Sequence, residues 1–141
     1  MTAARIGILG GSFNPIHQGH LALASYAQSE LNLDKVYFVP SFQTPLKDPR
    51  SLLPAPLRAR LVERAIRPHP RFKLSEVELK RKGRSYTVDT LRFFKKRLGA
   101  KAQLYFLAGA DNAKTFSRWK SPQQVLKLCR FVWVPDRKSV V

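Results

Sequence analysis

RIGILGGSFNPIHQGH, residues 5–20, combines a short apolar run, two adjacent glycines and two histidines three residues apart. The apolar run predicts a strand over Arg5–Leu9, and the helical spacing that follows predicts a helix over Gln18–Leu31. A glycine turn between a strand and a helix offers an anion unpaired backbone N–H groups and the positive end of the helix dipole. We therefore expect this turn to bind a nucleotide phosphate.

Apolar segments of strand length alternate with helical patterns along the rest of the chain. The predicted strands are Arg5–Leu9, Lys35–Pro40, Phe72–Val77, Gln103–Ala108 and Arg130–Val134. The predicted helices are Gln18–Leu31, Pro56–Arg67 and Thr87–Leu98, with Gly99 as the cap of the last. This order predicts an α/β fold, a Rossmann-like parallel sheet of about five strands with helices on both faces. Residues 1–141 are predicted to form a single domain.

The chain is strongly basic. It contains 26 Lys+Arg against 9 Asp+Glu, a formal net charge of +17. Such an excess favours polyanionic partners, so nonspecific polyanion binding is one expectation. The alternative is that the charge only keeps the protein in solution.

Cysteine usage and hydropathy exclude several classes of protein. Cys129 is the only cysteine, which excludes a disulfide framework and a cysteine-based zinc site, and its apolar surroundings predict a buried small side chain. No apolar run approaches the roughly 20 residues of a membrane helix, so no membrane association is expected. The N-terminal apolar run is interrupted by Gly10-Gly11, which argues against a signal peptide. A cytoplasmic location is predicted.

The two histidines are the strongest candidates for chemistry. His17 and His20 can face the same way at a helix start, and each imidazole can donate to an oxygen that gains charge in phosphoryl transfer. Gly10 and Gly11 lack a Cβ, so the backbone can approach a phosphate closely. Either histidine alone would suggest a surface or capping role, whereas the pair favours function. A histidine zinc site is the weaker alternative, because no nearby Cys, Asp or Glu completes a ligand set.

Residues 10–20 resemble the G-x-F-x-P-x-H-x-G-H signature of the nucleotidylyltransferase superfamily, in which both histidines bind the ATP phosphates. Three later segments are similar to motifs of the nicotinate (or nicotinamide) mononucleotide adenylyltransferases. They are Pro45-Leu46-Lys47, the S-Y-T-x-D-T-L match at residues 85–91, and Gly109-Ala110-Asp111 followed by Trp119. Glu76 and Glu78 stand where that family often has an acidic residue.

This resemblance implies adenylyl transfer from ATP to nicotinate mononucleotide, giving nicotinate adenine dinucleotide and pyrophosphate in NAD biosynthesis. It makes His17 and His20 the catalytic residues. The ATP-binding residues that it implies are Gly10, Gly11, Ser12, Phe13, His17, His20, Gly109 and Asp111. The implied substrate-binding residues are Lys47, on the phosphate side, and Tyr86, Thr87 and Trp119, in the pyridine pocket. Mg²⁺ is expected to come with ATP, held by substrate oxygens and water rather than by protein ligands.

Simpler roles compete for some of these residues. Thr87 can cap its helix, Trp119 can belong to the core, and Lys47 can be one basic loop residue among several. Asp89 is predicted to support a helix N-terminus. The family's second phosphate-binding element, which resembles I-S-S-T-x-x-R, does not occur in these 141 residues. The alternative prediction is therefore a truncated, catalytically weak or inactive nucleotide-binding domain with a basic polyanion-binding surface.

Overall fold

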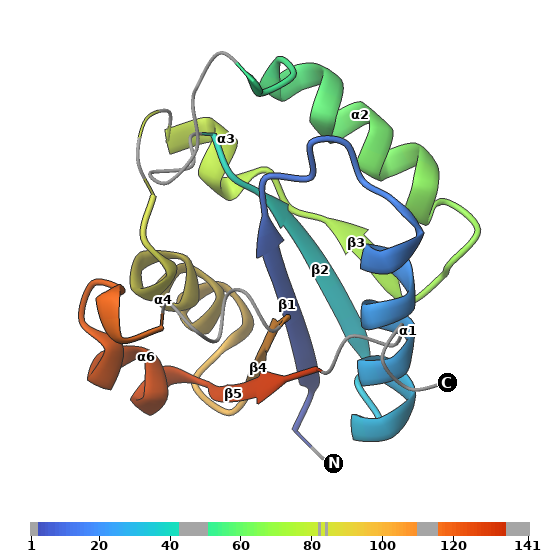
Figure 1. Cartoon of the computed structure of the whole chain (residues 1–141). Helices are drawn as coiled ribbons and strands as arrows, with labels where there is room; N and C mark the ends of the chain where they lie inside the picture. The colour runs from blue at the N-terminus through green and yellow to red at the C-terminus, as the bar shows by residue number, and fades with distance from the viewer. Residues whose placement is uncertain (1–2, 43–50, 82, 84, 110–115, 135–141) are drawn as a thin grey trace.

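A parallel sheet with helices on either side forms the centre of the molecule (Figure 1). The computed structural model describes residues 3–42, 51–81, 83, 85–109 and 116–134. Among them, the five strands follow the order β3-β2-β1-β4-β5, and every neighbouring pair is parallel. The strands are β1 (Arg5–Gly11), β2 (Lys35–Pro40), β3 (Phe72–Leu74), β4 (Gln103–Ala108) and β5 (Arg130–Trp133). The predicted α/β sheet is confirmed.

The helices agree with the sequence prediction where the apolar pattern is long. They are α1 (Gln18–Leu31), α2 (Ala55–Ile66), α3 (Val77–Arg81), α4 (Thr87–Leu98), the 3₁₀ helix η2 (Phe116–Arg118) and α6 (Pro122–Leu128). Helices α1 and α4 have the predicted bounds, and α2 is displaced by one residue. Gly99 follows α4 with a φ of 97°, a conformation that suits a glycine cap.

The predicted strand over Phe72–Val77 is wrong beyond Leu74. Strand β3 pairs with β2 only from Phe72 to Leu74. The backbone N–H of Lys80 then donates to the carbonyl of Glu76, which starts the short helix α3. A three-residue edge strand is too short to show a clear alternation of apolar and polar residues. The sequence pattern therefore did not show where β3 ends and α3 begins.

Alternating side chains of the strands build one core on each face of the sheet. The core on the α1–α2 face contains Leu9, Phe38, Leu107, Ala24, Ala27, Val62 and Ile66. The core on the α4–α6 face contains Ile6, Ile8, Leu104, Phe106, Val88, Leu91, Phe94 and Val125. Figure 1 shows the two pairs of helices on opposite sides of the sheet, as the sequence predicts.

Cys129 is a buried residue of the α4–α6 core. The residue is 9% exposed, and its thiol donates to the carbonyl of Val125 at 3.3 Å. Burial raises the pKa of the Cys129 thiol to about 11, so the reactive thiolate is disfavoured at neutral pH. The prediction of a buried small side chain is confirmed. Within the described part of the chain, no helix has the length and apolar character needed to cross a membrane.

The strand order fixes where a ligand can bind. Strand β1 lies between β2 and β4, and the chain runs from β1 outward to β3 before it returns to the other side of β1. In open parallel sheets, ligands bind beyond the carboxyl ends of the strands at such a switch point. The turn after β1 and the segment after β4 therefore share one edge of the sheet.

Candidate functional site

The glycine pair belongs to strand β1, which corrects the prediction of a glycine turn. Gly10 and Gly11 pair with Val39 and Pro40 of β2, so the strand extends two residues beyond Leu9. The left-handed residue is instead Phe13, with a φ of 47°. Its side chain is buried in the α1–α2 core, which fixes the turn to the body of the protein.

His17 and His20 form a reciprocal cap at the start of α1. The N–H of Gly19 donates to Nδ1 of His17 at 3.0 Å, and the N–H of His17 donates to Nδ1 of His20 at 3.1 Å. The two rings stack with their centroids 3.9 Å apart. The expectation that the pair faces the same way is confirmed. Because both Nδ1 atoms are acceptors, each neutral imidazole carries its proton on Nε2.

Gly19 is required by the position of the His17 ring. A Cβ on Gly19 would lie 2.8 Å from Cε1 and 3.0 Å from Nδ1 of His17, closer than side chains tolerate. The glycine therefore lets the first imidazole fold back over the helix N-terminus. His17 is exposed and His20 is partly exposed.

The arrangement suits anion binding better than metal binding. Two Nε2–H donors stand at the positive end of a 14-residue helix. Among the described residues, no three His, Cys, Asp or Glu side chains gather into a metal-binding group.

Tyr86 and Trp119 lie on the α4–α6 side of the sheet. Tyr86 is the N-cap residue of α4, and the Nζ of Lys120 lies 4.6 Å from the centre of its ring. The ring of Trp119 is partly exposed and packs edge-on against Phe106, with 5.4 Å between centroids. Trp119 thus packs against the core and is still partly exposed to solvent. Thr87 is the first residue of α4 rather than its cap, so a capping role for Thr87 is wrong.

Phe106 connects the two halves of the candidate site. A Cβ on Gly10 would lie 3.7 Å from Cζ of Phe106, and Trp119 packs against the same ring. The end of β1 and the tryptophan are therefore separated by one aromatic side chain. Gly109 follows β4 at the same edge and faces Leu23 of α1. Lys47 and Asp111 lie outside the described residues.

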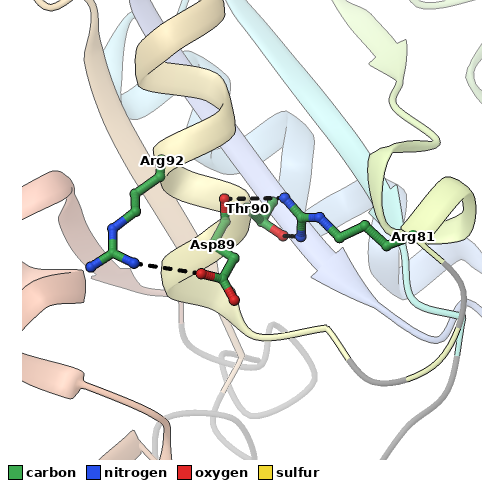
Figure 2. A network of polar contacts seen from close by, with 4 residues as sticks. All are labelled: Arg81, Asp89, Thr90 and Arg92. Atoms are coloured by element: carbon green, nitrogen blue, oxygen red, sulfur yellow. Dashed lines mark hydrogen bonds and ion pairs between the residues drawn. The ribbon is translucent and has the colours of Figure 1, made fainter.

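A polar network holds α3 against the start of α4. Figure 2 shows Arg81 reaching the hydroxyl of Thr90 and the backbone carbonyl of Asp89, each at 3.2 Å, and Arg92 beside the carboxylate of Asp89 at 3.5 Å. The buried Thr90 hydroxyl donates to Glu78 at 2.6 Å. Asp89 lies in the first turn of α4, as predicted. The network positions the helix start that carries Tyr86.

Glu78 makes this network sensitive to pH. Burial raises the pKa of the Glu78 carboxyl above its ordinary value of 4.5, so the folded state favours the protonated form. The resulting contribution to stability is complete below pH 4.5 and is lost as the pH rises through the higher folded-state pKa. Glu78→Gln resembles the protonated carboxyl and should escape this loss.

The free energy of unfolding of Glu78→Gln is therefore expected to increase relative to the unsubstituted chain as the pH rises from 4 to 8. Urea unfolding across this range measures the difference. Glu63→Gln is the matched control, since Glu63 forms an exposed ion pair with Arg67. A Glu78→Gln difference that does not grow with pH would contradict the assignment.

Two residues of this region had no predicted role. The side chain of Asn14 accepts from the N–H of Leu53 at 2.7 Å and donates to the carbonyl of Ser51 at 2.8 Å. Arg58 of α2 is 1% exposed and bonds to four backbone carbonyls. The sequence carried one signal for Arg58, because it stands on the same helix stripe as the buried Val62 and Ile66.

Known proteins are similar to this chain in sequence and in fold. A probable nicotinate-nucleotide adenylyltransferase from Dehalococcoides mccartyi is 42% identical over 135 residues, covering 96% of this chain and 66% of the relative. A protein of the same name from a Thermoanaerobacter species is 44% identical over 128 residues, covering 91% and 61%. The chain thus spans less than two thirds of the length of these curated relatives.

Two solved structures have the same fold. A Vibrio parahaemolyticus protein assigned as a nicotinate-nucleotide adenylyltransferase superposes with a TM-score of 0.80 at 22% identity, covering 97% of this chain and 77% of that one. A Plasmodium falciparum nicotinic acid mononucleotide adenylyltransferase, solved with NaAD, gives 0.75 at 18% identity, covering 94% and 75%. At these identities the likeness shows the fold alone.

The family model for cytidylyltransferase-like proteins matches residues 8–138. This range includes most of β1, the histidine cap and each later strand of the sheet. The match covers most of the chain, and the chain therefore belongs to the cytidylyltransferase-like family.

Proposed function

We propose that this chain transfers the adenylyl group of ATP to nicotinate mononucleotide, giving nicotinate adenine dinucleotide and pyrophosphate. The observation that carries the proposal is the histidine cap of α1. Both Nδ1 atoms are used inside the protein, so both Nε2–H groups serve as donors at the positive end of the helix. Two fixed donors beside a helix N-terminus suit the phosphates of ATP.

The chemistry requires positioning and neutralisation of charge more than acid–base catalysis. A phosphate oxygen of nicotinate mononucleotide attacks the α-phosphorus of ATP and forms a P–O bond. The bond from that phosphorus to the bridging oxygen breaks, and pyrophosphate leaves with the electron pair. The attacking phosphate is already an anion at neutral pH, so no protein base is needed. His17 and His20 would hold the phosphate oxygens on which charge builds. ATP would enter as its magnesium complex, with Mg²⁺ on phosphate oxygens and water.

The choice of nicotinate mononucleotide as the acceptor is supported by the side of the site that carries Tyr86 and Trp119. Tyr86 and Trp119 offer aromatic surfaces for a pyridine ring. The ammonium of Lys120, 4.6 Å from the Tyr86 ring centre, adds a positive charge there that favours the nicotinate carboxylate over the neutral amide. Both curated relatives are named for the nicotinate reaction.

Pyrophosphate release is the direct test. The chain is incubated with ATP and Mg²⁺ plus nicotinate mononucleotide or nicotinamide mononucleotide, and CTP replaces ATP in a parallel series. We expect release with ATP, faster with the nicotinate substrate. Turnover with CTP alone would reassign the reaction within the family, and no release with any pair would reject it. Steeply salt-dependent binding to nucleic acid without turnover would instead favour the polyanion-binding alternative, which rests on the +17 charge.

A further inference from the structure

Arg58 is a buried arginine beside the β1–α1 turn, which precedes the histidine cap. It lies on α2, is 1% exposed, and its neighbours on the buried stripe are Val62 and Ile66. Burial lowers the pKa of the Arg58 guanidinium, yet an arginine stays protonated at neutral pH. A buried charge is costly unless its hydrogen bonds are satisfied, so its partners indicate what the side chain does.

These partners are backbone carbonyls from three separate segments. Nη1 donates to Ser12 of the β1–α1 turn and to Ser41, both at 2.7 Å. Nη2 donates to Phe42 at 3.2 Å, and Nε donates to Leu53 at 2.8 Å. The planar fork of arginine can join such segments in one geometry, which a lysine ammonium cannot reproduce.

The bond to Ser12 sets the direction of the next donor. The peptide between Ser12 and Phe13 is trans, so its carbonyl and its N–H point in opposite directions. With the Ser12 carbonyl turned toward Arg58, the Phe13 N–H is directed away from the guanidinium. The left-handed φ of 47° at Phe13 is an unfavourable conformation that needs such support from its surroundings.

We propose that Arg58 is a positioning residue that fixes the Ser12–Phe13 peptide, so that the Phe13 N–H donates to the phosphate bound by His17 and His20. The proposal rests on the proposed function in taking the bound anion as the ATP phosphates. Arg58 acts through the backbone and does not touch the reacting atoms. Asn14 supports the same arrangement by tying the turn to Ser51 and Leu53.

The test follows the Phe13 amide by NMR in ¹⁵N-labelled chain titrated with inorganic tripolyphosphate, together with steady-state kinetics. Arg58→Lys keeps the charge and loses the fork, and Arg58→Gln keeps two N–H donors and loses the charge. Arg60→Lys is the matched control, because Arg60 is an exposed arginine of the same helix. In the unsubstituted chain and in Arg60→Lys, the Phe13 amide signal should shift as tripolyphosphate binds.

In Arg58→Lys, the Phe13 shift should vanish and the Kd for tripolyphosphate should rise about tenfold, the loss expected for one donor to a charged group. Turnover should fall through kcat and the KM for ATP, with the KM for nicotinate mononucleotide unchanged. Unchanged tripolyphosphate binding in Arg58→Lys would overturn the proposal. Unfolding of both Arg58 variants would assign the residue to global stability and also overturn it.

The tripolyphosphate titration tests the role of Arg58 separately from the adenylyl-transfer reaction. If the unsubstituted chain releases no pyrophosphate but its Phe13 shift still depends on Arg58, the reaction fails and the role of Arg58 stands. If tripolyphosphate does not bind the unsubstituted chain, both are rejected.

Discussion

His20→Gln is expected to lower kcat for adenylyl transfer by about 10²–10³-fold, the loss typical of removing one donor to a charged transition state. Glutamine is chosen because at the third helix position it can still accept from the N–H of His17, as histidine Nδ1 does. The cap and the helix should therefore persist while the Nε2–H donor is lost. Pyrophosphate release measures the effect, and circular dichroism reports the helix content.

His69→Gln is the matched control for this experiment. His69 stacks on Phe72 with 4.8 Å between ring centroids and precedes β3, at the opposite edge of the sheet from the histidine cap. Its replacement should leave kcat unchanged. Turnover of His20→Gln close to that of the unsubstituted chain would show that this imidazole is only a capping group.

Leu107→Ala is expected to lower the free energy of unfolding by about 2–5 kcal/mol. Leu107 is 0% exposed on β4, where it pairs with Leu9 on one side and Val132 on the other. Neighbours on both sides limit how far the structure can close around the lost side chain, so a cavity should remain. Urea unfolding measures the change.

A leucine-to-alanine substitution at an exposed position is the control, because it removes the same atoms without leaving a buried cavity. Leu126 of α6 is 54% exposed, and Leu126→Ala should change the free energy of unfolding by no more than about 0.5 kcal/mol. Equal losses at the two positions would refute the assignment of β4 to the interior of the sheet.

Long periodic segments of this chain predict their own structure. Continuous apolar runs predicted β2 and β4 with the observed bounds, and the helical spacing of apolar residues did the same for α1 and α4. The elements that the prediction missed are short. Helices α3 and α6 span five and seven residues, fewer than the periodicity of a helix needs to stand out.

The candidate site was predicted by its motifs but not by its internal support. The pattern of residues 10–20 indicated a pair of histidines at a helix start, and the structure adds how they are held. Local sequence does not show that Ser12 and Leu53 share one guanidinium, because these contacts join residues far apart in the chain. The strand pairing of Gly10 and Gly11 depended in the same way on β2. The predicted ligand roles of the site residues stay predictions.

The division of the interior into two cores has a consequence for how new specificities arise. The phosphate end of the candidate site rests on the α1–α2 core through Phe13, whereas Tyr86 and Trp119 rest on the α4–α6 core. Substitutions in the second core alter the acceptor pocket directly, and they reach the phosphate end through Phe106, whose ring faces Gly10 at the end of β1. A lineage can change the acceptor substrate while the α1–α2 core keeps the histidine cap in place. Within the proposed function, the specificity for ATP and the specificity for the acceptor can evolve largely separately, because the sheet divides the two cores that support them.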